Sequence, residues 1–277
     1  MSDRRRTSAL GASALIGAGL IGFWLLVAVA APLLAPFPPN ATLHPFAPPG
    51  MTTGGGETFW LGTDQLGRDI LSRLIWGART VLVFAPLATI VAYTLGVGMG
   101  LCAGYLGRRA DATIMFLANV ILSFPVLVLY ILIISTFGAS PLNIVLAVTF
   151  ASAPGIARIV RALTVGERVR DYVAAAQTRG ESAVFVMVVE ILPNISGPLI
   201  VDACLRLGYV VITIGALGFL GLGLPPPDPD WGGMINEARP VALAFPYMAV
   251  APCLALVSLV LGCNLLADGL RSPHRNR

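Results

Sequence analysis

The stretch TVLVFAPLATIVAYTLGVGMGLCAGY, residues 80–105, contains no charged side chain. An α-helix rises about 1.5 Å per residue, so roughly 20 residues cross a hydrocarbon core about 30 Å thick. The stretch therefore predicts a membrane-spanning helix. Gly96, Gly100 and Gly104 recur every four residues within it, which places them on one helical face where a second helix can approach closely.

The whole chain shares this apolar character. It has 277 residues, of which 56% are hydrophobic and 12% charged, whereas soluble domains average about 45–50% apolar and about 25% charged residues. The excess lies in long runs, which predicts an all-α, polytopic membrane bundle of six transmembrane helices. We expect these helices near residues 10–34, 80–105, 112–136, 141–162, 197–222 and 246–267.

The first of these runs also resembles a secretory signal, because three arginines precede it and AVAAP, residues 28–32, follows. Signal cores are about 7–15 residues long, whereas Ala9–Ala31 is free of charge throughout. We therefore interpret it as a retained first helix. The expected organisation is a tail and first helix (1–35), an outer loop (36–79), a core transmembrane domain (80–267, with a loop at 164–195) and a tail (268–277).

The arginines predict the orientation of the bundle. With the N-terminus in the cytoplasm, thirteen arginines are inside and four outside, which is the bias that cytoplasmic loops show. With six spans, both termini are then cytoplasmic in a cell (inner) membrane. The inside set is Arg4, Arg5, Arg6, Arg108, Arg109, Arg158, Arg161, Arg168, Arg170, Arg179, Arg271, Arg275 and Arg277, and the outside set is Arg68, Arg73, Arg79 and Arg239.

Several classes of catalytic site are excluded by composition. The chain has no lysine, so it forms neither a phosphate-binding P-loop nor a Schiff base. It lacks HExxH, and its four cysteines form no CxxC pair. GAGLIG, residues 17–22, lies inside an apolar run and follows no strand, which argues against a dinucleotide site. We expect a non-enzymatic chain without a cofactor or metal of its own.

Two loops are expected outside the membrane. Residues 36–56 are rich in proline and glycine and should be irregular. Thr63 or Asp64 is the expected N-cap of an interfacial helix leading into the second span, with an apolar face formed by Leu66, Ile70, Leu71, Leu74 and Ile75. Tryptophan and charge in the two loops indicate either a docking surface or membrane-interface anchors, at Trp60, Asp228, Asp230 and Trp231.

One charged pair lies inside a predicted span. Asp202 and Arg206 are four residues apart, so they share a helical face. An unpaired arginine at this depth is costly, which requires a partner or a water-filled cavity. The pair is either an intrahelical structural contact or part of the lining of a translocation path.

The loop at 164–195 is expected to form two short helices. Asp171 is the predicted cap of the first, and Gly180 its left-handed stop. Ser182 is the predicted cap of the second, which Pro193 should end. Three consecutive alanines, residues 174–176, make a thin helix that fits a groove in another protein, although an ordinary solvated connector is the alternative.

These segments resemble ABC-importer permeases. YVAAAQTRGES (172–182) followed by ILPN (191–194) resembles their EAA loop, while LGTDQLGRDILSRLIWGAR (61–79) and ALGFLGLGLPPPDPDWGGMI (216–235) are similar to segments of dipeptide/oligopeptide permease C subunits. The chain departs from the pattern at Ala174, where the family has an acidic residue, and at Glu190, where it often has a basic residue or histidine.

The resemblance implies the type I ABC importer transmembrane fold and a permease subunit of a peptide importer. The implied partners are a homologous permease, one or two ATPase subunits carrying ATP and magnesium, an extracytoplasmic substrate-binding lipoprotein, a peptide and membrane lipid, with no nucleic acid. A stand-alone secondary transporter is the alternative, although we expect no broken helix of the kind such transporters use. The residues implied to contact the ATPase are Asp171, Tyr172, Ala174, Ala175, Ala176, Arg179, Gly180 and Glu181.

Overall fold

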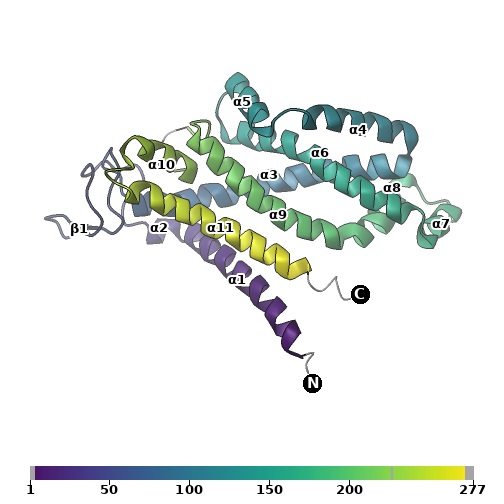
Figure 1. Ribbon diagram of the computed structural model, residues 1–277, viewed down its shortest axis with the longest axis horizontal. Helices are drawn as coiled ribbons and strands as arrows, with labels where there is room; N and C mark the ends of the chain where they lie inside the picture. The colour runs from purple at the N-terminus through teal and green to yellow at the C-terminus, as the bar shows by residue number, and fades with distance from the viewer. Residues whose placement is uncertain (1–3, 226, 272–277) are drawn as a thin grey trace.

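The computed structural model describes residues 4–225 and 227–271, and most of them are helical (Figure 1). Residues 272–277 of the expected C-terminal tail lie outside the described residues. The elements are α1 (Arg4–Val29), α2 (Ala31–Leu34), β1 (Met51–Thr52), β2 (Thr58–Phe59), α3 (Ile70–Leu106), α4 (Arg108–Leu122), α5 (Val126–Phe137), α6 (Pro141–Arg168), α7 (Asp171–Thr178), α8 (Ala183–Phe185), the π-helix η1 (Val186–Ile191), α9 (Leu192–Phe219), α10 (Trp231–Ala238), the 3₁₀-helix η2 (Arg239–Val241) and α11 (Tyr247–Arg271).

Five helical segments are long and apolar enough to cross a membrane, and a bent pair makes a sixth span if it counts as one. The five lie in α1, α3, α6, the continuous helix Ala183–Phe219 and α11. The all-α membrane bundle is thereby confirmed. The bent pair is α4 and α5, whose axes differ by 86°.

The prediction of one straight helix over 112–136, and of no broken span, was wrong. The break falls at Ser123–Pro125, between the end of α4 and the start of α5. Proline has no N–H to donate and its ring clashes with the preceding helical turn. It also pushes the residue before it, Phe124, away from helical geometry. The apolar run conceals this break because both halves remain apolar.

The glycine stripe of α3 packs against α6, as its spacing predicts. A Cβ added at Gly96 would lie 2.6 Å from Ile156 Cβ, and one at Gly104 would lie 2.6 Å from Thr164 Cβ. Real Cβ atoms do not approach so closely, so these positions accept no side chain without moving the helices apart. Small residues of this kind drive helix association in membranes, where apolar burial alone gives little gain.

Helix α1 packs against α11 through a similar contact. A Cβ at Gly17 would lie 2.7 Å from the carbonyl oxygen of Gly262, whereas Gly19 and Gly22 face open space. The Trp24 indole donates a hydrogen bond of 2.8 Å to the Ser258 hydroxyl. The close-packing interpretation of GAGLIG therefore holds for its first glycine alone.

The segment before α3 differs from the prediction. Helix α3 begins at Ile70, where Asp69 caps it by accepting a hydrogen bond of 2.7 Å from the Ser72 amide. Residues 63–69 form a turn instead of an interfacial helix, and α3 continues unbroken to Leu106. The domain boundary expected at residue 79 therefore falls inside a helix. Within the loop expected to be irregular, β1 pairs with β2 in a short antiparallel hairpin.

Pro193 does not end a helix, contrary to prediction. It lies in the first turn of α9, directly after the π-helix η1, and the segment runs helically from Ala183 to Phe219. The wider turn of a π-helix changes the hydrogen-bond register. That change accommodates a residue that lacks an N–H. The helix therefore continues through Pro193 with a local π-helical hydrogen-bond pattern.

The two ends of the bundle carry different structures. At one end lie the β-hairpin, α2 and α10, which we call the α10 end. At the opposite end α7 and α8 connect α6 to α9, which we call the α7 end (Figure 1). The described ends of α1 and α11 that adjoin the termini are directed away from the α10 end. The two loops that the sequence places on opposite sides of the membrane therefore lie at opposite ends of the bundle.

Candidate functional site

Helix α7 is a short helix with a well-defined end. Arg170 occupies its N-cap position without a side-chain hydrogen bond, and Asp171 is its first residue, so the predicted cap at Asp171 was wrong by one position. A carboxylate in the first turn still favours the helix through its dipole.

Two other predictions for this segment are confirmed, the end of the first helix at Gly180 and the cap of the second helix at Ser182. Gly180 has φ +79, its amide donates to the Gln177 carbonyl at 3.0 Å, and the Glu181 amide donates to the Ala176 carbonyl at 3.2 Å. These two bonds form a Schellman motif. Ser182 caps the next helix by accepting from the Phe185 amide at 3.2 Å.

The alanine run has two faces. Val173 and Ala176 are fully buried within this chain, in a cluster that includes Val186 and Ile191. Ala174 and Ala175 are exposed. The prediction that Ala176 enters a groove of another protein is therefore wrong, because its side chain is already buried in this chain, in a cluster with residues of η1.

Polar contacts tie α7 to neighbouring helices. The Tyr172 hydroxyl donates to Glu167 at 2.8 Å, and Gln177 donates to the Tyr105 hydroxyl of α3 at 3.1 Å. Burial, together with the bond to Glu167, raises the pKa of Tyr172 to about 12. The phenol therefore keeps its proton at physiological pH and remains a donor, so this tether does not change with ordinary pH.

Arg179, the C-cap residue of α7, explains the unusual acidic residue at 190. Its Nη2 lies 3.1 Å from Glu190 Oε1, and its Nε lies 3.7 Å from Glu181 Oε1. Glu190 belongs to the π-helix η1, so its ion pair with Arg179 joins η1 to the end of α7. The side chain of Arg179 is about half exposed, so such a pair contributes little to stability and mainly orients the groups.

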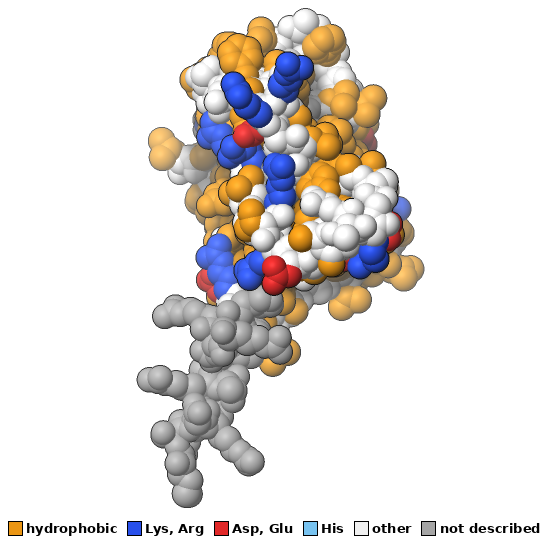
Figure 2. All heavy atoms as spheres, turned by 90° about the vertical axis from the view of Figure 1, so that its right-hand side faces the viewer, with side chains coloured by type: hydrophobic (Ala, Val, Ile, Leu, Met, Phe, Trp, Pro, Cys, Tyr) orange, Lys and Arg blue, Asp and Glu red, His pale blue; other side chains and the backbone are white. Residues whose placement is uncertain are grey.

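Arginines gather on the surface of the α7 end, as Figure 2 shows. The exposed arginines of the elements that meet at this end are Arg108, Arg109, Arg168, Arg170 and Arg179, and Arg158 is exposed farther back on α6. Arg161, which is half-buried, forms a bidentate ion pair with Asp111. This basic surface surrounds α7, so an acidic partner is electrostatically favoured there.

A cavity opens in the middle of the bundle, at the predicted charged pair. Asp202 accepts a hydrogen bond of 2.7 Å from Arg206 Nε and another from the Tyr93 hydroxyl of α3. Arg206 lines a cavity of about 270 Å³, so it does not face lipid alone. The pair is thus both an intrahelical contact and part of a cavity wall.

The broken span contributes to the same cavity. Leu122 and Val126, which flank the break between α4 and α5, both line it. Tyr130 of α5 lines it too and interacts through its hydroxyl with Ser152 of α6 and Thr213 of α9. The wall therefore combines apolar side chains with one guanidinium and a few hydroxyls.

Two of the residues expected to dock a partner at the α10 end are buried. Asp230 is the N-cap of α10, where it accepts from the amides of Gly232 at 3.3 Å and Gly233 at 3.0 Å. Burial raises its pKa to about 6. Trp231 has 0% exposure and donates a hydrogen bond of 2.9 Å to the Leu74 carbonyl.

The docking prediction for this pair was therefore wrong, because both side chains hold α10 against α3 and α9. A Cβ at Gly77 of α3 would lie 2.7 Å from the Trp231 ring, so the glycine makes the space that the indole fills. Trp60 and Asp228 are exposed, and they stay available for docking.

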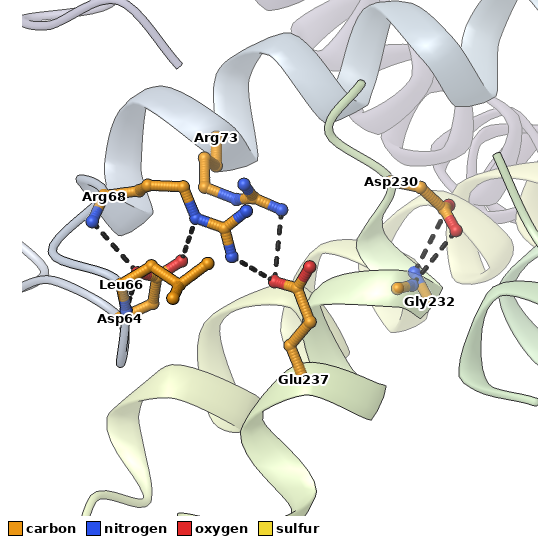
Figure 3. Close-up of polar contacts among 8 residues, drawn as sticks. Asp64, Leu66, Arg68, Arg73, Asp230, Gly232 and Glu237 are labelled. Carbon is orange, nitrogen blue, oxygen red and sulfur yellow. Dashed lines mark hydrogen bonds and ion pairs between the residues drawn. The ribbon is translucent and has the colours of Figure 1, made fainter. Parts of the chain in front are cut away.

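An ion-pair network fixes the turn before α3 to α10 (Figure 3). Arg68 binds Asp64 at 2.6 Å and Glu237 at 2.5 Å, and Arg73 binds Glu237 at 3.2 Å. Arg68 and Arg73 are buried, while Glu237 is partly exposed. The network joins segments more than 160 residues apart in sequence.

Several residues of these sites are not identifiable from the sequence alone. Tyr93, which fixes Asp202, lies in an apolar run that also holds Thr89 and Thr94, so nothing in the run distinguished it as the partner of Asp202. Gly155, beside Arg206, and Glu237 carried no signal in the sequence, since each acquires its role from a partner distant along the chain.

A family model described as a binding-protein-dependent transport system inner membrane component matches residues 93–272, a segment that holds both α7 and the cavity pair. The chain belongs to this family. It is accordingly a multi-pass membrane permease, a non-catalytic component of a transport system.

Curated relatives extend the match over most of the permease. This chain is 39% identical over 257 residues to a di/tripeptide transport system permease protein of Pseudomonas aeruginosa, and the match covers 91% of this chain and 85% of the relative. It is 38% identical to a dipeptide transport system permease protein of Haemophilus influenzae, with 93% and 88% covered. A glutathione transport system permease protein of Pectobacterium atrosepticum is 38% identical over 221 residues, with 80% and 73% covered.

Proposed function

We propose that this permease is one subunit of an ATP-driven importer of short peptides and forms half of its translocation pathway. The relatives are named for the transport of dipeptides, tripeptides and glutathione, and all of these are short peptides with a free carboxylate. The mid-bundle cavity that combines apolar walls with a charged pair suits such a solute.

The α7 end faces the cytoplasm in this proposal, and the α10 end faces outward. Both termini are then cytoplasmic. The support is the distribution of arginine, since thirteen of eighteen lie at the termini or in the loops assigned to the inside. The basic surface around α7 adds to it (Figure 2).

Helix α7 is proposed to couple the permease to an ATPase subunit. The observation that carries this is the division of its faces, with Val173 and Ala176 anchored in this chain and Ala174 and Ala175 exposed at the tip. A helix that is fixed to η1, which continues directly into α9, and that is uncovered on its other face transmits a push from a partner to the bundle as a rigid lever. ATP and magnesium would bind to the ATPase, and this chain needs no cofactor of its own.

The remaining partners act at the membrane and outside it. A homologous permease completes the pathway as the second half of a heterodimer, and one or two kinds of ATPase subunit serve the pair. An extracytoplasmic substrate-binding lipoprotein delivers the peptide. Its docking surface on this chain includes the exposed Trp60 and Asp228 at the α10 end.

The proposal is tested by reconstitution. The complete complex, co-purified with its ATPases and second permease, is placed in liposomes with the binding protein outside and ATP inside. We expect uptake of radiolabelled dialanine that depends on ATP and on the binding protein. Ala175→Leu should reduce this uptake while the complex stays assembled, because the added bulk lies on the exposed face. Ala176→Leu is the comparison that should instead destabilise the chain itself.

The broken span favours one rival function, a stand-alone secondary transporter, because such transporters build their sites from discontinuous helices. The rival predicts dialanine exchange by the isolated chain without ATP. Exchange of that kind, together with an absence of ATP-dependent uptake by the complex, would contradict the importer.

A further inference from the structure

We propose that the cavity beside Arg206 is a recognition site for the carboxylate end of the transported peptide, with Arg206 as the residue that binds it. The inference deepens the proposed function and rests on it. It names a group in the membrane that selects the solute, in addition to any selection by the binding protein.

The guanidinium of Arg206 is held in place from one side. Its Nε donates to Asp202 at 2.7 Å, and Asp202 also accepts from the Tyr93 hydroxyl. Asp202 is the carboxylate with which Arg206 pairs among the described residues. A side chain fixed in this way loses little freedom on binding a ligand, which favours affinity.

The other side of the guanidinium lies near Gly155 of α6, and both residues line the cavity. A Cβ built at Gly155 of α6 would lie 3.5 Å from Nη1 and 3.6 Å from Nη2 of Arg206. A side chain at residue 155 would therefore be in van der Waals contact with these two nitrogens, and glycine leaves that place to a ligand. Two parallel N–H donors are the group that binds a planar carboxylate in bidentate geometry.

The rest of the cavity suits a small organic zwitterion better than an inorganic ion. Its volume of about 270 Å³ is near the lower limit for small-molecule pockets, about 300 Å³. Apolar groups such as Leu122, Val126 and Val210 line much of it, and hydroxyls of Ser152 and Thr213 supply weaker polar contacts. An apolar wall next to a single carboxylate-binding group matches a short peptide.

The break between α4 and α5 gives the site a means of changing shape. Leu122 and Val126 are the residues on either side of the break, and both touch the cavity. A change in the 86° angle between the helices would alter the part of the cavity wall that these two residues form. Binding at this place is therefore positioned to respond to rearrangement of the bundle.

The test uses the purified complete complex in nanodiscs without the binding protein. Binding of tritiated dialanine is measured directly, and unlabelled dialaninamide, which lacks the carboxylate, serves as competitor. We expect the wild-type complex to prefer dialanine over the amide by about tenfold or more, as for a lost charge-assisted hydrogen bond. Arg206→Gln should weaken dialanine binding by about tenfold to a hundredfold and leave amide binding unchanged.

Two further variants separate binding from folding. The double change Asp202→Asn with Arg206→Gln leaves no unpaired charge in the membrane and should lose the preference in the same way. Gly155→Ala keeps the Asp202–Arg206 pair but fills the space beside the guanidinium, so it should also weaken dialanine binding. Arg158→Gln, at an exposed arginine of α6 that does not line the cavity, is the matched control and should bind as the wild type does.

Equal affinity of the wild-type complex for dialanine and its amide overturns the inference, as does an unchanged preference in the assembled Arg206→Gln complex. Failure of the wild-type complex to bind dialanine, while it still imports the peptide with ATP and the binding protein, overturns the site but leaves the importer standing. A wild-type complex that imports no peptide contradicts the proposed function itself.

Discussion

The contact between α3 and α6 depends on the absence of a side chain at Gly100. A Cβ placed there would lie 2.5 Å from Val160 Cβ and 2.8 Å from the carbonyl oxygen of Ala157, whereas ordinary contacts begin at 3.4 Å. Gly100→Ala therefore forces the helices apart by about 0.9 Å, the difference between 3.4 and 2.5 Å. Overpacking of this kind lowers the free energy of unfolding by about 1–3 kcal/mol.

The matched control is Gly98→Ala on the same helix, where a Cβ meets no atom within 4 Å. Both changes gain the same helix propensity, so the difference in stability between the two variants isolates the packing term. We expect Gly100→Ala to unfold at lower temperature than Gly98→Ala when tryptophan fluorescence of the purified protein is followed on heating.

A second variant locates the strain. In a Val160→Gly background the side chain opposite residue 100 is absent, so the penalty of Gly100→Ala should shrink, although the Ala157 carbonyl keeps part of it. Equal melting temperatures for Gly100→Ala and Gly98→Ala would refute the packing argument. A penalty that is unchanged in the Val160→Gly background would show that the strain lies elsewhere.

Three further outcomes are expected. Gly180→Val should lower substrate-stimulated ATP hydrolysis by the complex, because residue 180 has φ +79 and β-branched residues resist positive φ. Gly180→Asn should keep most of this activity, because asparagine tolerates positive φ. Full activity of the valine variant would contradict the role of α7 as a rigid lever. The folded-state pKa of Asp230 is about 6 against 3.8 unfolded, so its ionisation reduces the free energy of unfolding as pH rises from about 4 to 6. Asp230→Asn, which still caps α10, should flatten that part of the pH–stability curve. A curve that the substitution leaves unaltered would refute the raised pKa of Asp230. Trp231→Ala should lower the free energy of unfolding by about 3–5 kcal/mol in thermal or denaturant melts, because Trp231 is buried. Trp60→Ala, at an exposed residue, should change it by less than about 0.5 kcal/mol and weaken only the stimulation of ATP hydrolysis by the binding protein. Equal losses of stability in the two variants would contradict the difference in burial.

The sequence anticipated features that depend on neighbours within a few residues. Length and apolarity of a run determine whether a helix can span a bilayer, so most spans were predicted close to their observed places. Gly180 ends α7 and Ser182 caps α8 because a positive φ and a capping hydroxyl act within one turn. The spacing of Gly96 and Gly100 likewise identified a helix-packing face, since the period of the α-helix is fixed.

Local signals failed where two of them competed. Asp69 caps α3, although Thr63 and Asp64 are also capping residue types, because Asp64 is occupied by Arg68. Pro125 breaks a span whereas Pro193 is accommodated after a π-helix. Proline lowers the stability of a helix at either position, and the packing of the surrounding helices determines whether the chain breaks or adjusts.

The sequence by itself determined the membrane class, most of the spans, the end of α7 at Gly180 and the one charged pair within a span. Only the tertiary structure decided which face of each element is covered, so that Ala176 and Trp231 are buried while Ala175 and Trp60 are free. It also brought Tyr93 to Asp202, 109 residues away in sequence. Periodicity and caps act over one or two helical turns, whereas burial and long-range partners are fixed only when whole helices pack, and no pattern within one segment contains that information.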